Sequence, residues 1–351
     1  MRLIVIKIVM DDVNMNTANI KLLYDVHSQE CKTLIEEAIS KHGFAPEHNY
    51  DYFVSYTSKK MKPVFVDFGN NKGLFAIEWD DDSYQVISEV MAPEDERCNL
   101  VLLFLETIFS DSYLKKVPKV LVEFPPLLRK QIKKQLSQNN TDSNTTSNII
   151  IGNILHHYHT PIIALQGWDS TLQGPEFSKL RKAKGRFFRN FKVEVLKEQE
   201  VLSVGIDEFE KVIHEWRKNR KSTDTAYYED YLNFFRNKFN GSACHIAIRL
   251  NGVLCGVSAA WAVPNTNGKT VYYAINLHNY SVSELGDFLT VLFLDELKKQ
   301  GFEYLDFGSS DEKLLAYKKK FKPIRQYETL CFYIRNSRFN NKSVDNSKVV
   351  D

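Results

Sequence analysis

The sequence lacks the features that mark secreted, membrane-spanning or metal-binding proteins. Its 351 residues include five cysteines, and none of them forms a Cys-x-x-Cys pair or another metal-ligand spacing. Such scattered cysteines are typical of reduced core residues. No stretch approaches the roughly 18 consecutive apolar residues of a membrane-spanning helix. The opening segment MRLIVIKIVMDD is too short and too soon acidic for a signal peptide. We therefore predict a cytoplasmic protein without a bound metal.

A strong charge imbalance is also absent. The chain has 46 Lys and Arg against 44 Asp and Glu, which gives a net charge of +2. This balance excludes a protein that coats nucleic acid through a basic surface over the whole molecule. Hydrophobic residues make up 43% of the chain and aromatic residues 13%, so a packed core is expected. Because 351 residues are more than one core usually serves, two domains are predicted.

Two polar segments of low complexity divide the chain. LSQNNTDSNTTSN covers residues 136–148, and a similar stretch begins at Asn336. Neither contains enough apolar surface to offset the entropy of ordering it. We therefore predict an N-terminal domain over 1–136, a flexible linker over 137–148, a C-terminal catalytic domain over 149–335 and a disordered tail over 336–351.

The two halves have the same order of predicted elements, which is three strands, a helix, a strand and a helix. In the first half these are residues 62–68, 73–80, 84–92, 98–111, 119–124 and 125–136. In the second half they are residues 244–250, 253–263, 270–277, 284–300, 304–308 and a helix after Ser309, with a final strand over 327–335. The pattern predicts an α/β (α+β) protein with two mixed, mostly antiparallel sheets.

The last helix carries three consecutive lysines. It follows Ser309, a good N-cap, and ends before Pro323. At about 100° per residue, Lys318 falls on the apolar face, whereas the next two lysines point away from it. The apolar side chains of this face are Leu314, Tyr317 and Phe321. A lysine at this position either extends to solvent or meets a negative partner, and a third interpretation is a cation that faces a substrate cleft.

A second basic segment, FSKLRKAKGRFFRNFK over 177–192, carries seven Lys or Arg and no acid. On a helical wheel its aromatic side chains share one side and most of its cations the other. An ordinary solvated face usually mixes both signs, so this face favours phosphates of RNA or of an anionic membrane surface. The predicted phosphate-binding residues are Arg181, Lys182, Arg186 and Arg189. A solvated amphipathic helix remains the alternative.

Three histidines, His156, His157 and His159, are close together in the segment HHYH. A metal site would need a carboxylate or cysteine partner, and the surrounding sequence offers none. We therefore interpret them as strand or surface histidines.

The order of elements resembles that of the GNAT acyltransferase fold. Two copies in tandem, with SELGDFLTVLFLDELKKQGFEYLDFG followed by LLAYKKKF, resemble the Fem-type and lysyl-phosphatidylglycerol-synthase-like transferases, in which the last helix commonly carries (F/Y)K-x-x-F. LRKAKGRFFRN is similar to the basic segment that opens the catalytic half of the latter group. The resemblance implies a tandem GNAT fold and an aminoacyl-tRNA donor.

The sequence departs from CoA-dependent GNAT enzymes at one turn. These enzymes normally hold the pyrophosphate of CoA on a Gly-rich turn before a helix. The corresponding turns here are MAPEDERCN (91–99), with three acids, and LHNYSVSELGDF (277–288), which retains Gly286 but brings two acids to the helix start. Acids at this position repel a diphosphate, so we predict a donor other than CoA and no cofactor.

The predicted function is therefore transfer of an aminoacyl group from aminoacyl-tRNA to an amine or hydroxyl of a lipid, a cell-wall precursor or a peptide. Lys318 is the predicted cation for the oxyanion or a donor phosphate, and three carboxylates are candidates for accepting a proton. These carboxylates are Asp306, Glu284 and Asp287. The predicted substrate contacts are Tyr273, Asn276 and Tyr317.

Two other functions fit the same sequence. A CoA-dependent GNAT N-acyltransferase with a degenerate turn would bind CoA thioesters saturably. A non-catalytic RNA- or membrane-binding module would bind polyanions tightly, without turnover and without dependence on Lys318.

Overall fold

The structure is a computed structural model that describes residues 3–6, 20–55, 57–110, 113, 115–142, 148–218 and 228–339. The chain forms two compact units. Unit 2 is Thr160–Tyr327, and unit 1 holds the described residues before Thr160 together with those from Glu328 onwards. Each unit contains a mixed sheet, as the sequence predicts.

The sheet of unit 1 has helices on both faces. Its strand order is β1 (Leu3–Ile6), β2 (Ile20–Leu23), β3 (Met61–Gly69), β4 (Lys72–Trp79), β5 (Tyr84–Val86), β6 (Lys119–Phe124), β13 (Arg325–Asn336) and β7 (Ile149–Ala164). Its helices are α1 (Gln29–His42), α2 (Tyr50–Val54), α3 (Glu94–Phe109) and α4 (Pro126–Asp142). One core packs α3 and α4 on the sheet, and a second core joins α1 and α2 to β3 and β4. Among the described neighbours from β1 through β13 in this order, only β5 and β6 run parallel.

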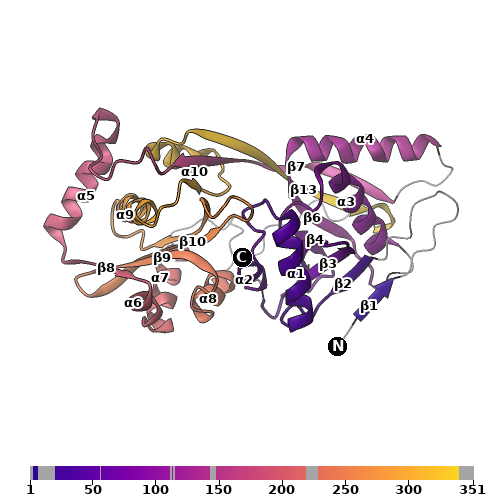
Figure 1. Cartoon of the computed structure of the whole chain (residues 1–351), viewed down its shortest axis with the longest axis horizontal. Helices are drawn as coiled ribbons and strands as arrows, with labels where there is room; N and C mark the ends of the chain where they lie inside the picture. Colours follow the sequence, from indigo (N-terminus) through magenta and orange to yellow (C-terminus); the bar gives the residue numbers. More distant parts are fainter. Residues whose placement is uncertain are drawn as a thin grey trace. The chain divides into compact units, whose positions relative to one another are not determined.

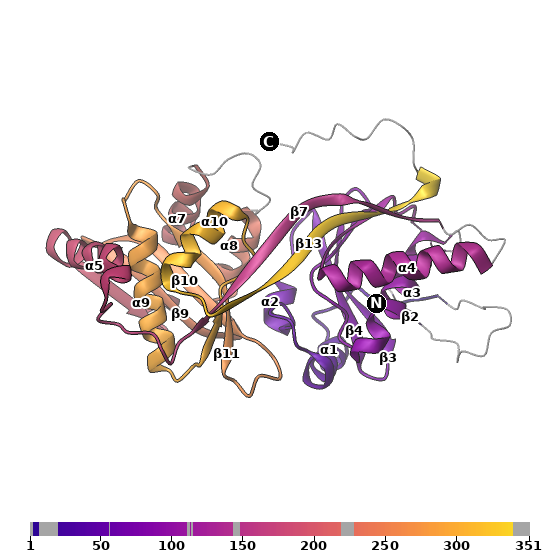
Figure 2. The same cartoon turned by 90° about the horizontal axis from the view of Figure 1, so that it is seen from above.

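Unit 2 repeats this arrangement. Its strands follow the order β12 (Tyr304–Asp306), β11 (Thr270–His278), β10 (Val253–Ala262), β9 (Ser242–Leu250) and β8 (Val193–Lys197), with the end of β7 beside β12. Among the described strands of unit 2, only β11 and β12 are parallel neighbours. One face carries α9 (Leu285–Lys299) and α10 (Glu312–Lys318), with α5 (Ser178–Asn190) packed on α9. The other face carries α6 (Gln199–Leu202), α7 (Ile206–Lys218) and α8 (Tyr228–Arg236) (Figures 1 and 2).

Some predicted boundaries differ from the observed ones. The helix α4 continues to Asp142, so the first residues of the expected linker are helical. The units divide between His159 and Thr160, because β7 begins in unit 1 and ends beside β12. The final strand, β13, pairs with β6 of unit 1 in the register Leu330↔Phe124, although it was expected in the second domain. The expected tail over 336–351 starts with Asn336, the last residue of β13, and continues in a 3-10 turn over Ser337–Phe339. Its remainder lies outside the described residues.

The lysine-rich helix begins two residues later than predicted. Its N-cap is Asp311, whose Oδ1 accepts a hydrogen bond from the N–H of Leu314 at 2.7 Å. Lys318 and Phe321 are buried as the wheel predicts, but Leu314 is 39% exposed. Leu315 occupies the buried face in its place, because the helix is short and closes in a 3-10 turn over Lys319–Phe321.

Phe187 anchors the basic helix α5 to unit 2. Its ring stacks on that of Phe288 in α9, with centroids 4.6 Å apart and planes 2° apart, and it is 1% exposed. The substitution Phe187→Ala is expected to lower the free energy of unfolding by about 3–5 kcal/mol. The matched control is Phe188→Ala, because Phe188 is 54% exposed and meets Phe288 only edge-on, with ring centroids 5.4 Å apart, so a smaller loss of about 0.5–1.5 kcal/mol is expected. Urea unfolding measures both, and equal losses would contradict this packing.

Candidate active site

Asp306 lies at the point where the parallel pair β11–β12 ends. Its register partner is Tyr272, the last residue of β11 that pairs with β12, and the chain then turns through Gly308 at a φ of +76°. The two oxygens of the Asp306 carboxylate accept hydrogen bonds from the Gly308 N–H at 2.9 Å and from the Tyr327 hydroxyl at 2.8 Å. Asp306 is 4% exposed and Tyr327 is 40% exposed. A buried carboxylate is thus connected to the surface through a phenol.

Burial raises the pKa of Asp306 to about 6. Desolvation disfavours the charged form of a carboxyl. The hydrogen bonds from Gly308 and Tyr327 and the charge of Lys318 oppose this effect but do not cancel it. Asp306 is therefore a stronger base than an exposed carboxylate, yet it is mostly ionised near pH 7.

Lys318 of α10 is held at the same turn. It is 6% exposed, and its Nζ donates hydrogen bonds to the carbonyls of Phe307 and Gly308, the second at 2.8 Å. The ammonium also lies 5.0 Å from the centroid of the Phe307 ring. Burial lowers the pKa of Lys318 to about 7, while Asp306 and Asp311 favour its charged form. A base and an acid with pKa values near neutrality thus occupy one turn, which is typical of catalytic sites.

A line of polar side chains joins β11, α9 and α10. The Asn276 amide donates to the Thr290 hydroxyl at 3.3 Å, and the Thr290 and Tyr317 hydroxyls are 3.2 Å apart. Thr290 is fully buried, and burial raises the pKa of Tyr317. Among the described residues, the buried Oδ1 of Asn276 has no hydrogen-bond partner. The structure thus brings together two of the three predicted substrate contacts, and it leaves an acceptor between them unused.

Tyr273, the third predicted contact, belongs to the core. Its hydroxyl lies 2.6 Å from that of Ser258, and its ring stacks on Phe293 and Phe307. Tyr273 therefore packs against Phe307, one of the two residues whose carbonyls accept from Lys318.

The other two predicted proton acceptors form ion pairs near the start of α9. Asp287 accepts from Lys320 at 2.9 and 3.0 Å, and Glu284 lies 3.0 Å from Arg186. These carboxylates occupy the positions at which a helix N-terminus attracts an anion. A Cβ on Gly286 would lie 2.7 Å from the His278 ring, so this glycine permits close packing. In unit 1, three acids lie in the first turn of α3, which leaves both turns acidic.

The predicted phosphate-binding residues of α5 differ in whether their charged groups already contact other parts of the protein. Arg181 donates to the carbonyls of Leu172 and Gly174, and Arg186 pairs with Glu284. Lys182 and Arg189 are exposed, as are Lys179 and Lys192. Lys184 is partly buried, and its Nζ lies 3.3 Å from Oδ2 of Asp295. The cationic surface of α5 is therefore formed by Lys179, Lys182 and Arg189, with Lys192 just after the helix end.

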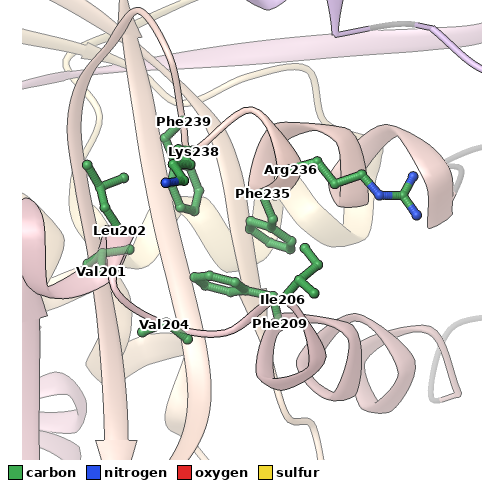
Figure 3. A pocket seen from close by; sticks show the side chains of 9 residues that line it. All are labelled: Val201, Leu202, Val204, Ile206, Phe209, Phe235, Arg236, Lys238 and Phe239. Atoms are coloured by element: carbon green, nitrogen blue, oxygen red, sulfur yellow. The ribbon is translucent and has the colours of Figure 1, made fainter.

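A separate pocket of about 340 Å³ lies on the opposite face of the sheet of unit 2, beside α6, α7 and α8 (Figure 3). Its lining is mostly apolar, and the guanidinium of Arg236 points away from the other side chains. The lining residues are Val201, Leu202, Val204, Ile206, Phe209, Phe235, Arg236, Lys238 and Phe239. None of the predicted site residues lies there.

Sequence reasoning missed Tyr327 and the histidine partner Glu328. Both lie near the start of β13, and the hydrogen bond of Tyr327 spans 21 positions. The only available signal was the alternation of polar and apolar residues in YETLCFYIR. Within the described residues, no helix is long and apolar enough to cross a membrane.

No protein-family model and no curated protein sequence matches the chain, but solved structures do. The C-terminal DUF2156 domain of a protein described as a lysylphosphatidylglycerol synthetase, from Agrobacterium fabrum, is 15% identical. It covers 88% of this chain and 92% of that one with a TM-score of 0.57. L-PGS from Bacillus licheniformis is 14% identical, with 89% and 93% covered and a TM-score of 0.54.

A tandem GNAT protein from the clavulanic acid biosynthesis pathway also matches. It is 10% identical, with 91% of this chain and 98% of that one covered and a TM-score of 0.54. At these identities the shared property is the fold. The chain has the GNAT-type fold found in lysylphosphatidylglycerol-synthase-like proteins, and the fold predicted from the sequence is confirmed.

Proposed function

We propose that the protein is an acyltransferase and that its reaction takes place at the turn formed by Asp306, Lys318 and Tyr327. The observation that carries the proposal is the hydrogen bond from the hydroxyl of Tyr327, a residue that is 40% exposed, to the buried Asp306 carboxylate. The pKa of this carboxyl is about 6, which suits a general base near neutral pH. The GNAT-type fold, shared with transferases, supports the assignment.

The proposed step needs a base and a stabiliser of negative charge. The acceptor amine or hydroxyl attacks the carbonyl carbon of the donor ester, and its proton passes to the Tyr327 oxygen as the phenolic proton moves to Asp306. The tetrahedral oxyanion then collapses, the bond to the donor oxygen breaks, and the released alkoxide takes the proton back along the same path. Lys318 stabilises the oxyanion through its charge and fixes the turn by holding two carbonyls.

We infer an aminoacyl-tRNA donor rather than an acyl-CoA donor. The ion pairs of Asp287 and Glu284 occupy the start of α9, which disfavours a pyrophosphate at this helix. The exposed cations of α5 and the names of two structural neighbours favour a donor or acceptor that carries phosphates. A lysylphosphatidylglycerol synthetase is named for a lysyl group and an anionic lipid, and the corresponding acceptor class here is an anionic lipid or a small amine.

A direct binding comparison tests the donor class. Acetyl-CoA, charged bulk tRNA and deacylated bulk tRNA are titrated against the full chain at physiological salt. Preference for charged tRNA is the expected result. Saturable acetyl-CoA binding with weak, salt-sensitive tRNA binding would instead support a CoA-dependent N-acyltransferase. Equal binding of both tRNA forms, without turnover, would favour a non-catalytic RNA-binding module.

The cationic surface of α5 is expected to contribute phosphate contacts. The double variant Lys182→Glu/Arg189→Glu should weaken tRNA binding about uniformly across tRNA species. The slope of log K against log salt should fall by about 0.7–0.9 for each phosphate contact that is lost. The matched control is Lys313→Glu, which reverses an exposed cation of α10. An equal effect of this control would show that only net charge matters.

A further inference from the structure

Two histidines of β7 and one carboxylate of β13 come together on unit 1. His157 Nε2 lies 3.1 Å from one oxygen of Glu328, and His159 Nδ1 lies 3.6 Å from the other. The two imidazole rings have centroids 4.6 Å apart. One ligand atom from each of the three residues lies within 4.8 Å of the others. The sequence interpretation of these histidines as lacking a carboxylate partner is therefore wrong.

The strand pairing explains why the three side chains meet. His157 and His159 are two positions apart, so they project from the same face of β7. Strands β7 and β13 are hydrogen-bonded neighbours, which places Glu328 across the strand pair from them. His156 is offset by one position and stacks instead on Tyr158, with ring centroids 5.5 Å apart.

We propose that His157, His159 and Glu328 form a binding site for a first-row divalent transition metal, for which Zn²⁺ is the probe. Zn–N and Zn–O bonds of about 2.0–2.2 Å in tetrahedral geometry place ligand atoms about 3.3–3.6 Å apart. His157 and His159 lie 3.1 and 3.6 Å from the two different oxygens of Glu328, which is close to this spacing, and one ligand atom from each of the three residues lies within 4.8 Å of the others. A small adjustment of side-chain rotamers would let one ion replace the hydrogen bond between His157 and Glu328.

The chemistry of the three groups selects the class of metal. Two imidazoles and a carboxylate suit Zn²⁺, Co²⁺, Ni²⁺ and Cu²⁺, whereas Mg²⁺ and Ca²⁺ prefer oxygen ligands alone. In the tautomers that bind, His157 carries its proton on Nδ1 and His159 on Nε2. Any imidazolium releases a proton when the metal binds.

The site is open to solvent. The exposed fractions of the side chains are 48% for His157, 45% for Glu328 and 21% for His159. Three protein ligands leave a fourth position for water or for another ligand, as in open zinc sites. An ion here would also link β7 to β13, the strand that carries Tyr327. The metal proposal does not depend on the proposed transfer reaction.

Metal titration of the full chain tests the proposal. One equivalent of Zn²⁺ is expected to bind, with a rise in melting temperature, and Co²⁺ should give the visible absorption of a site with nitrogen ligands. The variants His157→Ala and Glu328→Gln should each lower the Zn²⁺ affinity by at least about 10-fold, because even changes in groups that only orient ligands cost about 10- to 100-fold.

The matched control is His156→Ala, which removes an exposed histidine from the other face of the same strand. It should leave the affinity, the stoichiometry and the Co²⁺ spectrum unchanged. Circular dichroism identifies any variant that fails to fold, and the isosteric Glu328→Gln keeps the test valid if His157→Ala does so. Binding that is unaffected by both ligand variants, or lowered equally by the control, would overturn the proposal.

Discussion

The variant Asp306→Asn is expected to lower the rate of acyl transfer by about 100- to 10,000-fold, the range that general acid–base catalysis typically contributes. Asparagine has the same shape as aspartate but cannot accept the proton. Its side-chain oxygen can still accept from the Gly308 N–H, and the Tyr327 hydroxyl can reverse its hydrogen bond. We therefore expect the fold and the binding of the donor to persist, so that the loss lies in the rate constant.

The pH dependence of this loss identifies Asp306 as the base. In the unmodified protein the rate should decrease as the pH falls through about 6, because protonation of Asp306 removes the acceptor. The residual rate of Asp306→Asn should lack this decrease. Steady-state transfer assays from pH 5 to 8 measure both profiles.

Two further variants complete the test of Asp306. Tyr327→Phe removes the phenol that connects the carboxylate to the surface, and it should reproduce most of the loss. The matched control is Glu303→Gln, which changes a carboxylate just before β12 that pairs with Lys269. This control should retain the full rate. A normal rate in Asp306→Asn would assign the proton to another group.

Local patterns in the sequence predicted most of the fold. The parallel strand pairs follow from the repeated order of strands, helix and strand, since a strand that follows a helix returns parallel to the strand before it. The burial of Lys318 follows from a helical period over a few residues. Such features depend on near neighbours in the sequence, so periodicity and capping patterns contain them.

Pairings across long separations could not be predicted in this way. The final strand β13 pairs with β6 of the first half of the chain and not with a strand of the second half. The alternation of apolar and polar residues in this strand is compatible with either partner. His157 is hydrogen-bonded to Glu328, which lies 171 positions away in the sequence. The residues around HHYH do not indicate that a carboxylate will lie beside the histidines. The proposed site combines both kinds of information. Asp306 and Lys318 are close in sequence and were predicted, whereas Tyr327 reaches Asp306 from β13, 21 positions further along the chain.

The variant Lys318→Met is expected to lower the rate of acyl transfer by about 100- to 1000-fold, the typical effect of removing one preorganised oxyanion donor. Methionine keeps much of the volume of the buried side chain, but it leaves the carbonyls of Phe307 and Gly308 without this donor. Donor binding should be largely retained. The matched control is Lys319→Met, which removes the adjacent exposed cation and should leave the rate unchanged.

The stability of the same variants reports the charge of Lys318 independently of activity. The pKa of Lys318 is about 7 in the folded protein and 10.5 in an ordinary lysine, so the unfolded chain binds more protons between these two values. Stability should therefore rise with pH between about 7 and 10.5, with a slope of at most about 1.4 kcal/mol per pH unit from this group. Lys318→Met should lose this component, and Lys319→Met should keep it.

Chemical denaturation at several pH values, with each variant compared with the unmodified protein, measures the component. If Lys318→Met and Lys319→Met show the same pH dependence, Lys318 is fully charged in the folded state. Its burial would then be offset entirely by the two carbonyls and the Asp306 carboxylate. If the transfer rate of Lys318→Met falls and the pH-dependent component of its stability is also lost, the Lys318 ammonium both titrates in the turn after β12 and acts on the reacting carbonyl.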